Sequence, residues 1–180
     1  IRRIVILPAL ETAGTQLKVA GEPKSPERDP NETLTRLIYQ VMSGLPNWQI
    51  VSESEAREVS QTITASNEPA RLRQLGEAVY ADAVLVSPVR RFRERVGDEW
   101  GVKSPASVAF ALELVDVRRG DVIWSASFDE TQKSLSENIF AIADITERGV
   151  RWLTAEQLAN EGVKKGVAQL HQLIARAAIS

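Results

Sequence analysis

The pattern of hydrophobic and polar positions predicts strands of two kinds. Residues 3–10, 48–52 and 81–87 are short apolar runs, which is typical of strands buried on both faces. Residues 106–117 and 122–128 form two longer arms on either side of a glycine turn, so they predict an antiparallel hairpin. The chain therefore contains five predicted strands.

The hairpin is apolar on both faces. In the register that we predict, Val117 lies opposite Val122, across a turn formed around Arg119 and Gly120. This register places Val115 opposite Trp124 and Ala111 opposite Phe128 on one face, with Phe110, Leu112, Leu114 and Ile123 on the other. A hairpin that faces water on one side would alternate apolar and polar residues, so we expect this one to be covered on both faces.

Four helices are predicted from capping residues followed by apolar side chains at helical spacing. Their N-terminal capping residues are Asp29, Ser52, Asn67 and Thr154, and the last helix spans residues 154–178. A shorter helical piece begins at Ser136. The elements thus follow the order strand, helix, strand, two helices, three strands and helix.

This order of elements predicts the topology. Right-handed crossovers place the second strand on one side of the first and the third strand on the other, with the crossover helices on opposite faces. The hairpin then extends the sheet beyond the third strand. We predict a single α/β domain over residues 1–180, built as a three-layer α/β/α arrangement around a five-stranded mixed sheet of order 2-1-3-4-5.

Two unusual segments lead to the edge where such a sheet usually binds ligands, at the carboxyl ends of the first and third strands. One is a long loop over residues 11–29, and the other is a projecting hairpin over residues 90–105. Arginine and tryptophan are enriched at protein interfaces. We therefore predict a partner-binding surface made of Arg91, Phe92, Arg93, Arg95 and Trp100.

Two other interpretations of the 90–105 segment stay open. Glu94, Asp98 and Glu99 lie among the arginines, so the segment could be a solvated surface of salt bridges. Arginines interleaved with aromatic residues could also hold phosphate or single-stranded nucleic acid, and the crevice of the sheet could hold a small ligand. The net charge of −2 gives the chain no overall positive electrostatic field that would attract nucleic acid, which disfavours that partner.

Catalysis has little support in the sequence. The chain has no cysteine, which excludes thiolate nucleophiles and cysteine-bound metals, and its single histidine, His171, lies beside the apolar stripe of the last helix. Neither a glycine-rich phosphate loop nor a GxSxG nucleophile motif occurs. We predict a domain that is not an enzyme and that uses no cofactor.

The hairpin carries a resemblance to a known group of proteins. Residues Leu114 to Val117, Gly120, and Val122 to Ser125 form a "V-D-V" strand end, a tight glycine turn and a "hydrophobic-hydrophobic-Trp-Ser" strand. In this pattern the chain resembles bacterial envelope lipoproteins related to CsgG, the amino-terminal domain of TolB, and LpoB. No counterpart of the membrane-spanning strands of CsgG is recognisable.

The resemblance implies a fold, a compartment and a kind of activity. The fold is that of an anticodon-binding domain, and the compartment is the periplasm, with a lipid anchor to the outer membrane through a cysteine upstream of Ile1. The implied activity is the binding of another envelope protein. The residues that carry the resemblance support the fold. The resemblance therefore indicates the fold of this chain more reliably than its function.

Overall fold

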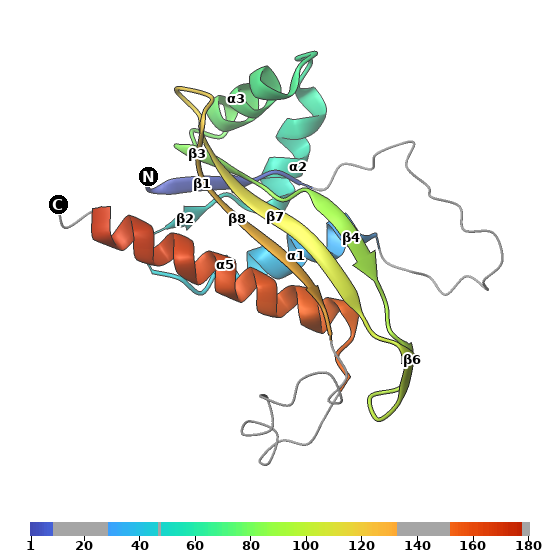
Figure 1. Ribbon diagram of the computed structural model, residues 1–180. Helices are drawn as coiled ribbons and strands as arrows, with labels where there is room; N and C mark the ends of the chain where they lie inside the picture. The colour runs from blue at the N-terminus through green and yellow to red at the C-terminus, as the bar shows by residue number, and fades with distance from the viewer. Residues whose placement is uncertain (9–28, 47, 133–151, 178–180) are drawn as a thin grey trace.

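The computed structural model describes residues 1–8, 29–46, 48–132 and 152–177, and it forms an α/β fold (Figure 1). The strands are β1 (Arg3–Ile6), β2 (Gln49–Ile50), β3 (Ala83–Val86), β4 (Val89–Arg93), β5 (Val96–Gly97), β6 (Val102–Ser104), β7 (Ser107–Asp116) and β8 (Val122–Thr131). The helices are α1 (Pro30–Met42), α2 (Glu53–Thr62), α3 (Glu68–Ala78) and α5 (Ala155–Ala177). Residues 11–28 of the predicted 11–29 loop, and the helical piece at Ser136, lie outside the described residues.

The order of the main strands is confirmed. Strands β2 and β3 flank β1 in parallel, β7 runs antiparallel to β3, and β8 runs antiparallel to β7. This is the predicted order 2-1-3-4-5, with β7 and β8 as the fourth and fifth strands. One strand was not predicted: β4 follows β3 along the same edge of β7, so the 90–105 segment begins inside the sheet.

The predicted register of the β7–β8 hairpin is wrong by one residue. Phe110 lies opposite Phe128 and Leu114 lies opposite Trp124, and the register shifts between Leu114 and Val115. Because side chains alternate between the faces of a strand, a shift of one residue moves the side chains of β8 from Trp124 onwards to the other face. Trp124 therefore lies on the same face as Leu114.

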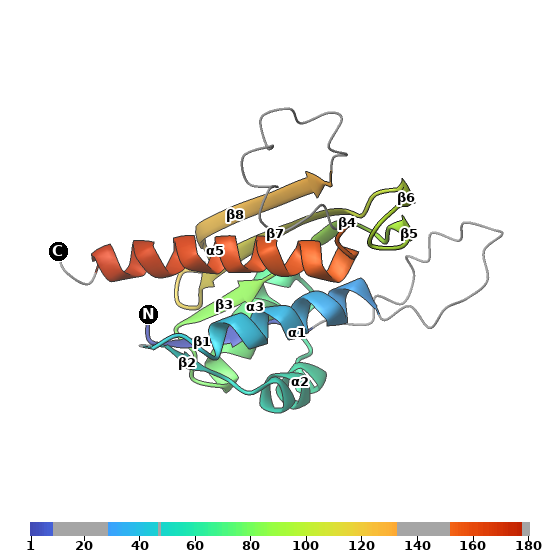
Figure 2. The same ribbon diagram turned by 90° about the horizontal axis from the view of Figure 1, so that it is seen from below.

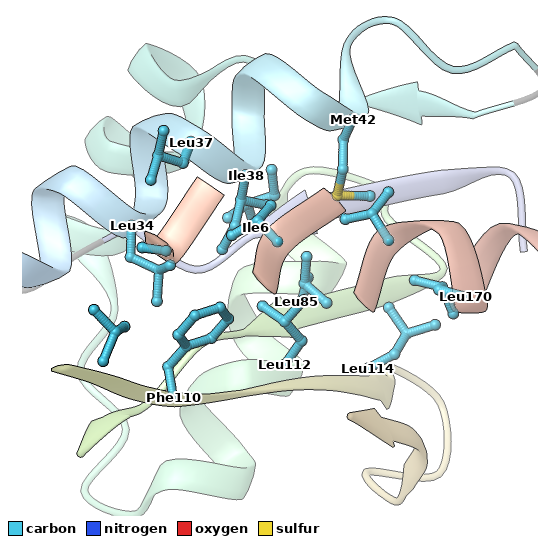
Figure 3. Packing of buried hydrophobic residues seen from close by; sticks show 14 of the residues in the cluster. Ile6, Leu34, Leu37, Ile38, Met42, Leu85, Phe110, Leu112, Leu114 and Leu170 are labelled. Atoms are coloured by element: carbon cyan, nitrogen blue, oxygen red, sulfur yellow. The ribbon is translucent and has the colours of Figure 1, made fainter. Parts of the chain in front are cut away.

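Two hydrophobic clusters lie on opposite faces of the sheet, because they take alternate residues of the same strands. Ile4, Ile6 and Leu85 belong to the larger cluster, which contains the apolar residues of α1 and α5 (Figure 3). Val5 and Val84 belong to the smaller cluster, which contains those of α2 and α3. We call the two sides the α5 face and the α3 face.

The expectation that the hairpin is covered on both faces is wrong for β8. On the α5 face, Trp124, Ala126 and Phe128 are half-buried beneath α5. On the α3 face, the alternate residues Ser125, Ser127, Asp129 and Thr131 are exposed. Helices α2 and α3 pack near β1 and β3 and do not extend over β8 (Figures 1 and 2). The complete three-layer arrangement, and its likeness to an anticodon-binding domain, therefore stay predictions.

The predicted helix starts are confirmed in detail. The side chains of Asp29, Ser52 and Asn67 accept hydrogen bonds from backbone N–H groups in the first turns of α1, α2 and α3. At α5 the bonding is reciprocal, because Thr154 Oγ1 accepts from the N–H of Gln157 and Gln157 Oε1 accepts from the N–H of Thr154. Capping of this kind supplies partners for N–H groups that the helix itself leaves unbonded.

Tyr80 follows the last turn of α3 in a left-handed conformation, with a φ of 54°. The N–H of Ala81 donates to the carbonyl of Gly76 (2.8 Å). This hydrogen bond is typical of a helix C-terminus in which the residue at the position of Tyr80 is usually glycine. Tyr80→Gly is expected to raise the free energy of unfolding by about 1 kcal/mol, because a side chain is unfavourable in this conformation. Urea denaturation measures the change. Tyr80→Ala retains a Cβ atom and should give no such gain. Equal stabilities of the two variants would therefore contradict the claim that the left-handed conformation of Tyr80 is unfavourable.

Candidate functional site

The five residues of the predicted binding surface do not form one continuous surface. Arg91 and Arg93 lie on the α3 face of β4, whereas Phe92 lies between them on the α5 face, opposite Val108. Arg95 follows β4, and Trp100 lies in the turn between β5 and β6. The structure thus separates side chains that the sequence placed together, because β4 is a regular strand whose side chains alternate.

Arg91 is part of the sheet surface. Its Nε donates to Ser107 Oγ (2.6 Å), and its guanidinium forms an ion pair with Asp129 on β8. Ser107 Oγ also bonds with Thr131 Oγ1 (2.6 Å). The arginine therefore spans β7 and lies over small side chains there, among them Ala109, which is buried. This supports the interpretation of Arg91 as a salt-bridged surface residue.

Phe92 is half-buried and packs against the larger hydrophobic cluster, so its side chain supports the fold. Arg93 is exposed, on the α3 face of the sheet. These two neighbours therefore cannot contact the same partner surface.

The β5–β6 hairpin is fixed to the segment that leads into α5, both at its base and in its turn. The guanidinium of Arg95 donates to the carbonyl oxygen of Trp152, and the N–H of Trp152 donates to the carbonyl oxygen of Glu99 (2.9 Å). Glu94 Oε1 accepts from the N–H of Ala155 (3.0 Å), in the first turn of the helix, where a negative charge is favourable. Arg95 and Glu94 thus hold the hairpin in place.

Trp100 projects from a turn that is fixed by hydrogen bonds. Asp98 Oδ1 accepts from the N–H groups of Trp100 (2.8 Å) and Gly101 (2.9 Å), and these bonds lower the pKa of the Asp98 carboxyl. The N–H of Asp98 donates to the carbonyl of Gly101 (3.0 Å). Gly97 has a φ of 121°, and a Cβ there would lie 2.3 Å from the carbonyl oxygen of Gly101, so only glycine fits. The turn holds Trp100 with 71% of its surface exposed.

Sequence reasoning missed the supporting residues of this site. Asp98 and Glu94 were taken only as charges that neutralise the arginines, whereas both accept backbone hydrogen bonds. The signal for Asp98 was present, because an aspartate followed by two residues and a glycine is typical of a turn in which the carboxylate bonds to the backbone. No local signal links Glu94 to the distant residue Ala155.

Two pockets among the described residues lie away from the predicted crevice. One of about 560 Å³ is lined by Ile1, Tyr80, Asp82 and Asp116, at the opposite ends of β1 and β3. A smaller one of about 180 Å³ lies between β8 and α5. The alternative hypothesis, a small-ligand or nucleic-acid site in the crevice, stays a prediction.

Within residues 1–8, 29–46, 48–132 and 152–177, no cluster of three histidine or carboxylate side chains could hold a metal ion. His171 packs edge-on against Trp48, with 5.6 Å between the ring centroids, which agrees with the predicted packing role. In the same part of the chain, no helix is long and apolar enough to cross a membrane.

No protein-family model matches the chain, and a comparison with curated proteins finds no match. Solved structures do match. The chain is similar to the hypothetical protein CT253 from Chlamydia trachomatis, with a TM-score of 0.53 and 11% identity over 98% of this chain and 99% of that one. At these identities the likeness shows the fold alone.

Two further matches are to a domain of LpoB and to a lipoprotein. The LpoB C-terminal domain from Salmonella enterica has a TM-score of 0.47 and 13% identity, over 73% of this chain and 83% of that one. Lipoprotein GNA1162 from Neisseria meningitidis has a TM-score of 0.47 and 16% identity, over 82% and 96%. LpoB, which the sequence resemblance named, is thus among the similar structures.

Proposed function

We propose that this chain is a non-enzymatic domain that binds another protein of the cell envelope, and that the β5–β6 hairpin is its docking element. The observation that supports the proposal is the position of Trp100. A tryptophan that is 71% exposed on a fixed turn offers a large contact area, and binding loses little conformational entropy because the turn is already ordered.

The surroundings of Trp100 fit a docking element. The hairpin projects beyond the end of β7, so a partner could reach it without displacing a helix (Figure 1). Val96 on the same hairpin is also exposed, which adds apolar surface to this element. Arg95 contributes by fixing the base of the hairpin, and Arg93 is exposed on the neighbouring strand.

The compartment that we propose is the periplasm, with a lipid anchor to the outer membrane. This part of the proposal rests on the sequence resemblance described above. It is tested separately, by fractionating cells that produce the full-length protein and by mass spectrometry for a lipid-modified cysteine upstream of Ile1.

Replacing Trp100 by alanine is expected to weaken partner binding strongly while leaving the fold intact. Loss of a central interface tryptophan typically costs about 2 kcal/mol or more, which corresponds to an affinity that is weaker by a factor of about 30. The measurement is crosslinking in intact envelopes, followed by quantification of the crosslinked product and thermal unfolding of the purified variant.

Tyr80→Ala is the matched control, because Tyr80 is an equally prominent aromatic residue, 87% exposed, on another part of the molecule. We expect this variant to give the crosslinked product in the original amount. If the product also persists with Trp100→Ala, the hairpin is not the docking element.

A further inference from the structure

The β5–β6 hairpin is joined to the main sheet through a break in the strand pairing. Strands β4 and β7 pair as far as Arg93 and Ser107, whereas β5 and β6 pair in a separate two-stranded sheet. Residues 94–95 and 105–106 lie between the two sheets and belong to neither, and we call them the hinge. Pro105 has no N–H group, so it cannot donate a backbone hydrogen bond across the hinge. Strand pairing alone therefore does not fix the orientation of the hairpin.

The segment that leads into α5 bonds to the hairpin on both sides of this break, and the hairpin and the start of α5 lie at the same end of the molecule (Figures 1 and 2). At the hinge, Glu94 Oε1 accepts from the N–H of Ala155 (3.0 Å), and the guanidinium of Arg95 donates to the carbonyl of Trp152. In the turn of the hairpin, the carbonyl of Glu99 accepts from the N–H of Trp152 (2.9 Å). These contacts hold the hairpin at one angle to the sheet.

The segment that leads into α5 is itself attached to the rest of the fold. The N–H of Leu153 donates to Gln132 Oε1 (2.7 Å), just after the end of β8. Thr154 and Gln157 bond reciprocally at the start of the helix, and the side chain of Ala155 is buried in the larger hydrophobic cluster. The segment can therefore serve as a fixed support for the hairpin.

Glu94 connects the backbone of the hinge directly to this support. The same oxygen, Oε1, accepts from the N–H of Arg95 (2.9 Å) in the hinge and from the N–H of Ala155 (3.0 Å) in the first turn of α5. The N–H groups of a first turn have no partner within the helix, so a carboxylate is favourable there. Glu94 is exposed and belongs to neither hydrophobic cluster. Its contribution is therefore to the position of the hairpin and not to the core.

We propose that Glu94 is the positioning residue of the docking element: by tying the hinge to the start of α5, it sets the orientation in which Trp100 meets the partner. This inference rests on the proposed docking function. A hairpin that turned freely about the hinge would lose conformational entropy when it docks, so its affinity would be lower. Loss of the Glu94 carboxylate therefore weakens binding although Glu94 itself contacts no partner.

Hydrogen exchange of the full chain tests the hinge without a partner. In Glu94→Ala, the amide proton of Trp152 should exchange about ten times faster, although it bonds to Glu99 and not to Glu94. The amide of Asp98 bonds within the turn and should stay protected, because the hairpin remains folded. Glu94→Gln keeps an oxygen acceptor and should restore slow exchange. Glu68→Ala, which removes an exposed acid from the first turn of α3, is the matched control and should behave like the wild type.

Crosslinking in intact envelopes tests the consequence for docking. The crosslinked product should fall by a factor of about 2–10 in Glu94→Ala and return in Glu94→Gln. Trp100→Ala should lose most of the product while the exchange of the Trp152 amide stays slow. Unchanged exchange of Trp152 in Glu94→Ala would overturn the inference, and so would a product that falls in Trp100→Ala but not in Glu94→Ala, which leaves the docking function intact. A product that persists in Trp100→Ala, with faster exchange of Trp152 in Glu94→Ala, would reject the docking function while Glu94 still fixes the hairpin.

Discussion

Replacing Phe110 by alanine is expected to lower the free energy of unfolding by about 3–5 kcal/mol, because the substitution removes a ring from the main core and leaves a cavity. Phe110 is buried on β7, between α5 and the neighbouring strands, and its ring centroid lies 5.3 Å from that of Phe128. Urea denaturation followed by circular dichroism measures the change. Leu173→Ala on the exposed side of α5 is the control and should cost much less.

A double-mutant cycle with Phe128 extends this prediction to the register of the hairpin. Phe128 is half-buried, so Phe128→Ala should cost less than Phe110→Ala. Because the two rings touch across the strands, the two substitutions should be coupled by about 0.5–1.5 kcal/mol. In the register predicted from the sequence, the rings lie on opposite faces and the coupling would be near zero. Additive effects of the two substitutions would therefore contradict the structure.

The elements of the fold could be predicted from the sequence because their signals are local. Asp29, Ser52 and Asn67 each cap the helix that follows, and their side chains accept the bonds that the capping pattern predicts. The short apolar runs at β1 and β3 indicate burial on both faces, and both strands contribute alternate residues to the two clusters. Right-handed crossovers then fix the strand order.

The register could not be predicted because it depends on the geometry of the turn. The N–H of Gly120 donates to the carbonyl of Asp116 (2.8 Å), and Gly120 has a φ of 75°. The strands leave this turn with a bulge at Leu114 and Val115, which shifts the pairing by one residue. Apolar residues on both sides of each arm gave no pattern that could distinguish the two registers.

The candidate site could be located only in outline. The composition of residues 90–105 indicated a projecting, arginine-rich segment, and the β5–β6 hairpin does project. The roles of individual side chains depend on contacts distant in sequence: Arg91 with Asp129, and Arg95 with Trp152. Such contacts bring together elements that the sequence separates, so no local pattern distinguishes an arginine that supports the fold from one that is exposed.

Gly76→Ala is expected to lower the free energy of unfolding by about 2 kcal/mol, although alanine favours helices over glycine by about 1 kcal/mol. A Cβ at Gly76 would lie 2.2 Å and 2.9 Å from the two γ carbons of Val117. Val117 is buried, and its N–H donates to the carbonyl of Asp82 (3.0 Å), so neither its side chain nor its backbone can withdraw easily. Helix α3 must therefore move away from the sheet. Thermal and urea unfolding measure the loss.

Two further variants decide whether this contact is the cause. Gly44→Ala is the matched control, because a Cβ there has only the carbonyl oxygen of Val41 within 4 Å, at 3.9 Å, and should not destabilise the fold. In a Val117→Ala background the γ carbons are absent and only the Cβ of residue 117 remains, at 3.2 Å, so Gly76→Ala should then cost much less than in the wild type. A loss of the same size in both backgrounds would show that the close approach of α3 to Val117 is not what requires glycine at this position.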